Sequence, residues 1–203
     1  MEKNKIKSLC VYCGSSIGSS PIYTDAAYAL AANLVENDIA LVYGGGHVGL
    51  MGKIADAVLK AGGKVTGVIP QALMVSEVSH DHLTELIVVK DMHERKATMA
   101  ALSDGFIAMP GGIGTLEELF ETLTWSQLGF HEKPVGLLNP AGFFDRLIDF
   151  IAHLVEQGFL KPEHADLLIT DTHATSLVQK IQQFEMQPGI SWLSRQAART
   201  LVP

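Results

Sequence analysis

One stretch in the middle of the chain combines a glycine-rich turn with carboxylates, a composition suited to binding an anion. The run Pro110-Gly111-Gly112-Ile113-Gly114-Thr115 is followed directly by a turn that contains Glu117 and Glu118. Glycines let the backbone bend around a ligand, and a helix starting there would direct N–H groups and its positive dipole end at a phosphate. A carboxylate beside that phosphate could meet a sugar hydroxyl or an attacking water molecule. We therefore predict a phosphate site at this turn, with Thr115 capping the helix.

The spacing of Thr115 and Glu118 also has a purely structural explanation. A threonine at a helix N-cap followed three residues later by a glutamate forms a capping box, in which the glutamate side chain reaches back to the N–H of the cap. Spacing alone favours this cap. It leaves open whether Glu118 acts on a ligand.

Arg95 bears on that choice. In the helix predicted after Asp91, the apolar residues Met92, Met99 and Leu102 form one stripe, and Arg95 lies on its side. A buried arginine is costly unless an anion meets it. The alternative is that its aliphatic stem packs while the guanidinium reaches water, and both interpretations stay open when this helix is considered alone.

Two charged segments are therefore expected to meet. The helices that carry Arg95-Lys96 and Glu118 follow neighbouring strands of the predicted sheet. A cleft shared by Arg95, Lys96, Glu118 and the glycine turn is geometrically reasonable.

A second glycine-rich turn, Gly44-Gly45-Gly46-His47-Val48-Gly49, matches the G-x-G-x-x-G pattern of dinucleotide sites. Such a site needs an acidic residue at the end of the next strand to hold the ribose hydroxyls. That strand ends Val68-Ile69-Pro70-Gln71, without a carboxylate. The glycines of this turn are equally explained by tight strand-to-helix packing.

The remaining motifs exclude several classes of site. Cys10 and Cys13 form a C-x-x-C within a predicted strand, where residues three apart point to opposite faces, so they can neither pair nor share a metal. The histidines lack the spacing of a metal site, and His80 and His82 are expected to be exposed in a polar loop. Neither a P-loop nor a G-x-S-x-G nucleophile elbow occurs.

The elements that must position these residues alternate between short apolar runs and helical patterns. Several runs are apolar without alternation, which is typical of strands buried on both faces of a parallel sheet. The pattern predicts an α/β fold with a doubly wound, mostly parallel sheet of about seven strands and helices on both faces. The strands are expected near residues 7–12, 39–43, 64–69, 84–89, 104–109, 134–138 and 166–170.

Helix start and stop signals support the predicted α/β fold. Ser20-Pro21 is typical of a helix start, and Gly62 and Gly158 are expected to end helices. Because ligands of such sheets bind outside the carboxyl ends of the strands, Gly14 and Ser15 join Gly44, Gly45 and Gly46 as candidate binding residues.

Composition limits the partners. The chain has 203 residues, 47% of them hydrophobic and 18% charged, which is typical of a compact globule. The net charge of −7 argues against nucleic acid or a membrane surface as a partner. No apolar run approaches the ~18 residues of a membrane span, and a cytoplasmic protein is expected. We expect residues 1–186 to form a single domain and residues 187–203 to form a C-terminal tail.

The joined motifs resemble those of a known family. Asp91-Met92-His93-Glu94-Arg95-Lys96, followed by Pro110 to Glu118, is similar to the M-x-x-R-K and P-G-G-x-G-T-x-x-E motifs of the LOG ("lonely guy") family. These proteins are cytokinin riboside 5′-monophosphate phosphoribohydrolases, long labelled as lysine decarboxylases. The resemblance covers nearly all of the chain except its tail.

The resemblance implies a Rossmann-like homodimer that splits the N-glycosidic bond of a purine nucleoside 5′-monophosphate without a metal or redox cofactor. The products would be ribose 5-phosphate and either adenine or an N6-prenylated adenine. Arg95 and Glu118 would form the catalytic pair. The substrate would be held by Glu77, Lys96, Thr124 and the loop Gly111, Gly112, Ile113, Gly114, Thr115 and Glu117. From the residues alone, Glu77 would be taken as a surface residue.

Three functions remain to be compared. A non-catalytic nucleotide carrier on the same fold is the main alternative to the hydrolase, and Glu118 beside Arg95 favours the hydrolase. An oxidoreductase is disfavoured by the missing acidic residue after the third strand. Lysine decarboxylation needs pyridoxal phosphate held by a lysine with an acidic partner for its ring nitrogen, and no lysine here has a recognisable setting for that.

Overall fold

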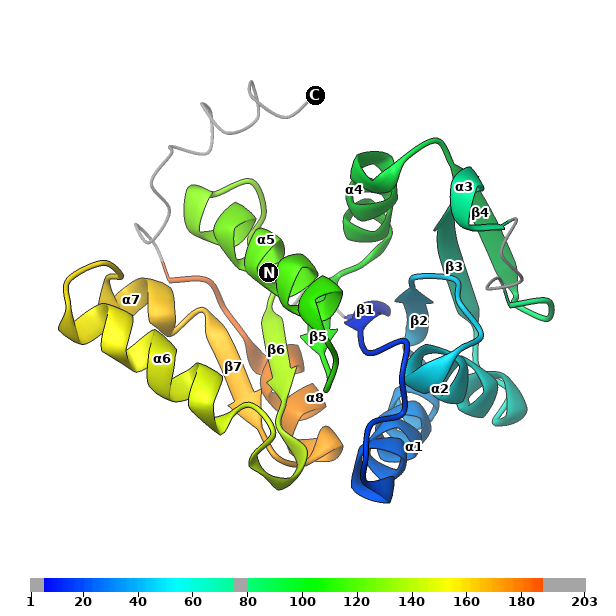
Figure 1. The fold of residues 1–203 in the computed structure, drawn as a ribbon, viewed down its shortest axis with the longest axis horizontal. Coiled ribbons are helices and arrows are strands. Elements are labelled where there is room, and N and C mark those ends of the chain that lie inside the picture. Colours follow the sequence, from blue (N-terminus) through cyan, green and yellow to red (C-terminus); the bar gives the residue numbers. More distant parts are fainter. Residues whose placement is uncertain (1–5, 75–79, 188–203) are drawn as a thin grey trace.

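A parallel sheet forms the centre of the protein, as shown by a computed structural model that describes residues 6–74 and 80–187. Its seven strands run in the order β4-β3-β2-β1-β5-β6-β7, and every pairing is parallel. The doubly wound sheet predicted from the sequence is therefore confirmed (Figure 1). The strands are β1 (Ser8–Tyr12), β2 (Ala40–Tyr43), β3 (Val65–Pro70), β4 (Glu85–Val89), β5 (Gly105–Ala108), β6 (Val135–Leu138) and β7 (Leu168–Asp171).

Helices cover both faces of the sheet. The apolar side chains of α1 (Pro21–Glu36), α2 (Gly49–Lys60) and α8 (Ala174–Gln183) pack in one core cluster. Those of α4 (Met92–Leu102), α5 (Ile113–Leu128) and α6 (Asp145–Glu156) pack in a second cluster on the other face. Short helices α3 (Gln71–Met74), η1 (Pro140–Gly142) and α7 (Pro162–Ala165) lie in the connections.

The strand alternation separates the two cysteines. Leu9, Val11 and Cys13 belong to the cluster under α1, whereas Cys10 and Tyr12 belong to the cluster under α4 and α5. Both thiols are free and buried, and burial raises the pKa of each well above its ordinary value. This confirms that the C-x-x-C pattern is structural, since such thiols are poor nucleophiles and metal ligands.

The connection through α4 creates the site described below. From β1 the chain steps outward to β4 at one edge, and α4 then crosses back over β3, β2 and β1 to reach β5. The prediction that the helices of Arg95 and Glu118 follow neighbouring strands is therefore wrong for the sheet. The two helices nevertheless lie on one face, because α4 spans the intervening strands. The winding direction changes between β1 and β5, where open α/β sheets bind their ligands.

Most of the predicted helix ends are confirmed. Ser20 caps α1 by accepting the N–H of Ile22, and Gly62 and Gly158 have left-handed backbones just past the ends of α2 and α6. The predicted cap at Thr115 is wrong, because α5 begins at Ile113 with Gly112 as its N-cap.

Within the described residues, every helix is too short or too polar to cross a membrane. Of the predicted tail, only Gln187 belongs to the described part of the chain.

Candidate active site

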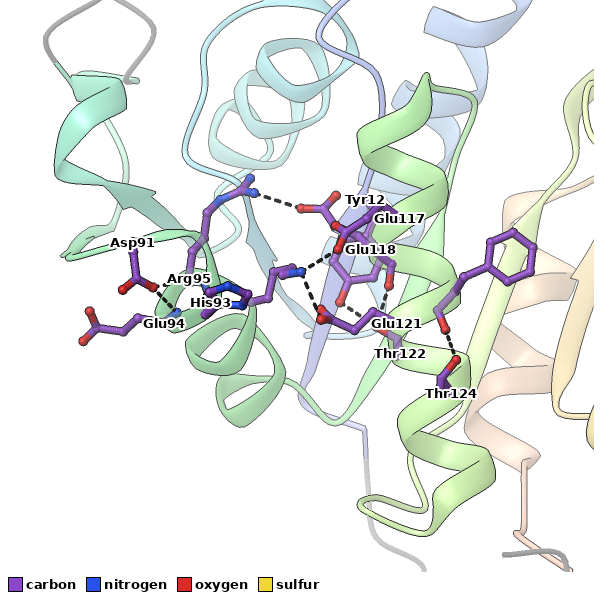
Figure 2. Close-up of polar contacts among 12 residues, drawn as sticks. Tyr12, Asp91, His93, Glu94, Arg95, Glu117, Glu118, Glu121, Thr122 and Thr124 are labelled. Atoms are coloured by element: carbon purple, nitrogen blue, oxygen red, sulfur yellow. Dashed lines mark hydrogen bonds and ion pairs between the residues drawn. The ribbon is translucent and has the colours of Figure 1, made fainter. Parts of the chain in front are cut away.

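The centre of the site is a buried ion pair between α4 and α5. The Nη1 atom of Arg95 donates a hydrogen bond of 2.9 Å to Oε1 of Glu118, and the two side chains are only 11% exposed. The Nε atom of Arg95 donates to the carbonyl of Val68 at the end of β3, at 3.1 Å. Figure 2 shows the guanidinium reaching from α4 toward the carboxylate on α5. The arginine on the packed side of its helix thus meets an anion.

The capping-box explanation of Glu118 fails for a geometric reason. Thr115 lies in the first turn of α5, three residues after the actual N-cap, so Glu118 is too far along the helix to form the box. The hydroxyl side of Thr115 instead packs on the glycine turn: a Cβ atom on Gly111 would overlap Oγ1 of Thr115. Glu118 is therefore available for its contact with Arg95.

Gly44 provides the space that the guanidinium occupies. A Cβ atom on Gly44 would overlap Nη2 of Arg95, and Met51 lies on the same side. This glycine is required by a contact between distant parts of the chain, and a dinucleotide site need not be invoked for it. The sequence could not reveal this, because the overlapping group comes from α4.

Burial and charge act in opposite directions on Glu118. Removal of the carboxylate from water raises its pKa, Arg95 lowers it, and the neighbouring charge of Glu117 raises it again. The net effect is a pKa above the ordinary value of 4.5. A carboxylate with a raised pKa is better suited to take up a proton than an exposed glutamate.

A second set of ion pairs lies beside the first. The Nζ atom of Lys96 donates to Oε1 of Glu117 at 2.5 Å and to Oε1 of Glu121 at 3.0 Å. Burial lowers the pKa of Lys96, but the hydrogen bonds and the negative charges of Glu117 and Glu121 together outweigh burial, and the pKa is raised. Lys96 is therefore a fixed cation that links α4 to α5. Glu121 is not among the predicted site residues, although it lies one helical turn after Glu117.

Two further side chains fix the backbone at Glu118. Oγ1 of Thr122 donates to the carbonyl of Glu118 at 2.8 Å, and the buried hydroxyl of Tyr12 lies 3.0 Å from the same Oγ1. Since the threonine proton is used on the carbonyl, the tyrosine is the donor of the second bond. The spacing of Glu118 and Thr122 on α5 is a weak sequence signal for this contact.

The three predicted binding loops meet at Gly14. Its N–H donates to the carbonyl of Pro110, and its own carbonyl accepts the N–H of Leu50. A cavity of about 230 Å³ opens at this junction, and Tyr23 and Phe143 form one wall with an edge-on ring contact. The cavity is lined by Gly14, Ser15, Ser16, Ile17, Gly18, Tyr23, Leu50, Pro110, Gly111, Gly112 and Phe143.

Not every predicted site residue lies with these groups. Thr124 is exposed on α5, where its hydroxyl donates to the carbonyl of Phe120, on the side of the helix away from Arg95 (Figure 2). Gly112, Ile113 and Gly114 are exposed at the start of α5, and Gly45 and Gly46 are buried within the second glycine turn. Glu77 lies outside the described residues.

The expected exposure of His80 is wrong. Its side chain is buried, and the imidazole bonds to Asp56 of α2. Among the described residues, His, Cys, Asp and Glu do not gather in any group of three that could hold a metal ion.

Comparison with known proteins decides the family. Residues 51–181 match a family model described as "Possible lysine decarboxylase". Over 183 residues the chain is 50% identical to cytokinin riboside 5′-monophosphate phosphoribohydrolase LOG5 of Arabidopsis thaliana, covering 90% of this chain and 80% of that protein. The probable phosphoribohydrolase LOGL3 of Oryza sativa subsp. japonica is 46% identical over 196 residues, with 94% and 93% covered.

This chain belongs to the LOG family. The resemblance stated from its motifs is thereby confirmed.

Solved structures add evidence on the fold of this LOG family member. The molybdenum cofactor binding protein of Rippkaea orientalis superimposes with a TM-score of 0.67 at 21% identity, covering 89% of this chain and 98% of that chain. The molybdenum cofactor carrier protein of Chlamydomonas reinhardtii gives 0.65 at 21% identity, with 87% and 96% covered. At such low identity these matches support the Rossmann-like fold alone.

Proposed function

We propose that this LOG family member is a phosphoribohydrolase that uses water to cleave the N-glycosidic bond of a purine nucleoside 5′-monophosphate. The products are the free base, adenine or an N6-prenylated adenine, and ribose 5-phosphate. The observation that carries the proposal is the buried Arg95–Glu118 pair at the carboxyl edge of the sheet. Relatives with about half of their residues identical are named for this reaction.

The chemistry needs a carboxylate near the anomeric carbon. As the bond from C1′ to the base breaks, positive charge develops on the ribose and negative charge on the base. The Glu118 carboxylate would stabilise that positive charge and take a proton from the attacking water, whose oxygen bonds to C1′. The departing base gains a proton from the solvent, and Glu118 afterwards returns the proton of the water to the solvent. The raised pKa of Glu118 supports its role in taking a proton from the water.

Arg95 orients this carboxylate in our proposal. Its guanidinium is fixed by Val68 and by the space at Gly44, so Oε1 of Glu118 has a single well-defined donor. A rigid group of this kind holds a catalytic residue without reorganisation during the reaction.

The 5′-phosphate is assigned to the glycine turns. The cavity at Gly14, Ser15, Gly111 and Gly112 lies at the start of α5, where backbone N–H groups and the helix dipole favour an anion. Binding energy from the phosphate would then hold C1′ against Glu118. Roles in substrate binding for Lys96, Glu117, Glu77 and Thr124, and for Gly44 to Gly46 and Ile113 to Thr115, are part of the proposal.

The proposal includes a homodimer, no metal or redox cofactor, and a cytoplasmic location. Large apolar side chains are exposed on α4 and α5, among them Met92, Ile113 and Phe120, and they support association of two copies. The free, buried thiols of Cys10 and Cys13 are in keeping with a reducing compartment.

Product analysis tests the function. The protein is incubated with AMP and, separately, with isopentenyladenosine 5′-monophosphate, and free base is measured by chromatography. We expect base and ribose 5-phosphate in equal amounts. Tight binding of nucleotide without any base release would instead favour a carrier, the alternative function on this fold.

A further inference from the structure

A buried histidine outside the Arg95–Glu118 pair holds the turn on which that pair depends. His80 is 7% exposed and joins three parts of the chain. Its backbone N–H donates to the carbonyl of Gly45 at 3.0 Å, and its Nε2 atom lies 3.0 Å from Oδ1 of Asp56 on α2. Its Nδ1 atom accepts the backbone N–H of His82 at 3.2 Å.

These contacts define the protonation of the ring. Because Nδ1 accepts a hydrogen bond from the main chain, it carries a lone pair, and the proton is on Nε2. His80 therefore donates to the carboxylate of Asp56. The carboxylate is 67% exposed, so its charge remains solvated while it anchors a buried ring.

The Gly45 carbonyl that His80 holds is next to Gly44, which leaves space for the Arg95 guanidinium. On one side of Gly44, the side chain of Tyr43 is completely buried in the core. On the other side, the carbonyl of Gly45 is held by His80. The turn also packs closely on β3, where a Cβ atom on Gly67 would lie 2.8 Å from the Cα atom of Gly45. Gly44 is thus fixed from both sides.

We propose that His80 and Asp56, the His80–Asp56 clamp, position Arg95 for the reaction by fixing the Gly44–Gly45 turn. The clamp ties His80 to α2, and the backbone N–H of the same residue holds the Gly45 carbonyl. Loss of the clamp would release His80 from α2 and let the turn shift toward the guanidinium, for which Gly44 leaves no spare room. The Arg95–Glu118 bond would then lose its geometry. His80 and Asp56 are positioning residues, and the proposal rests on the proposed function.

Substitutions of Asp56, the exposed partner of His80, give the sharper test of the clamp. Asp56→Ala removes the acceptor without touching the core, whereas Asp56→Asn keeps an oxygen at the same position. Asp149→Ala, on the exposed side of α6, is the matched control. For each protein, kcat and KM for release of adenine from AMP are measured together with the melting temperature. His80→Ala is made in parallel.

We expect Asp56→Ala to lower kcat about ten-fold with KM changed less than about two-fold, since small misplacement of a catalytic group has effects of this size. Asp56→Asn and Asp149→Ala should keep wild-type kcat. A wild-type kcat in Asp56→Ala, even with a lowered melting temperature, would overturn the clamp, and so would an Asp56→Asn variant as slow as Asp56→Ala. Wild-type protein that releases no base would overturn the proposed function and the clamp together.

Discussion

At the level of single residues, the site balances burial against one specific partner. Burial of Glu118 disfavours its charge, and Arg95 compensates in part. Removing one member of such a pair leaves the other buried and unpaired, so conservative substitutions are the informative ones. In the proposed function, this pair serves the chemistry of the reaction rather than the stability of the fold.

The raised pKa of Glu118 predicts the pH dependence of the reaction. The proposed mechanism needs the ionised carboxylate, and a raised pKa means that protonation begins at a higher pH than for an ordinary glutamate. As the pH falls, kcat/KM should therefore decline with a midpoint above 4.5. Rates of base release measured from about pH 4 to 8 check this. A midpoint at or below 4.5 would argue against Glu118 as the titrating group.

Arg95→Lys tests whether the shape of the guanidinium matters. A lysine has one donor group and cannot bond to Val68 and Glu118 in the same geometry. We expect kcat to fall at least about ten-fold, equivalent to about 1.4 kcal/mol. Arg146→Lys on the surface of α6 is the control and should have no effect. Equal activity of both variants would mean that only the charge is needed.

At the level of elements, the site is built where loops meet. Three loops converge on Gly14, and the crossover helix α4 brings Arg95 over β3 to α5. Glycines are used here for space as well as for backbone freedom. Gly44 makes room for a side chain, whereas Gly62 is needed for its left-handed backbone at φ 84°.

These two glycines give a matched pair of variants. Gly44→Ala should displace Arg95 and lower kcat at least about ten-fold. Gly62→Ala should lower the free energy of unfolding by about 1 kcal/mol through backbone strain and keep wild-type kcat. Kinetics of base release and denaturant unfolding of both variants check this. A Gly44→Ala variant with normal kcat would contradict the role of Gly44 in leaving space for the Arg95 guanidinium.

The sequence predicts the elements better than their contacts. Each strand begins within two residues of its predicted start, because apolar runs and glycine stops are local signals. The predicted start of α5 at Thr115 is wrong, because capping patterns do not show that a helix can begin after Gly112 without a side-chain cap. The burial of His80 and the role of Gly44 depend on partners far away in the chain, which spacing cannot show.

At the level of the whole molecule, the winding of the sheet explains why the predicted binding loops meet at Gly14. The winding changes direction between β1 and β5, and the loops after these strands carry Gly14 and the turn at Gly111. The stripe on α4 left open whether Arg95 meets an anion or reaches water, and the structure shows that it meets an anion. The stripe could not identify that anion as Glu118, since α4 and α5 follow strands that are not adjacent in the sheet.

Association of two copies into a dimer is a property of the whole molecule. We expect light scattering coupled to gel filtration to give twice the chain mass of 21.9 kDa, because exposed apolar residues on α4 and α5 would be covered in a dimer. Phe120→Glu on α5 should shift the mass toward that of the monomer, and Phe159→Glu after α6 is the control. A wild-type protein that stays monomeric at micromolar concentration would contradict this expectation.

Glu118→Gln tests the central claim most directly. The amide preserves the shape of the side chain and an oxygen for Arg95, but it cannot take a proton from water. We predict that this variant binds AMP with near wild-type affinity, measured by calorimetry, while release of adenine falls more than about 100-fold. Adenine release at the wild-type rate by a folded Glu118→Gln protein would contradict the account.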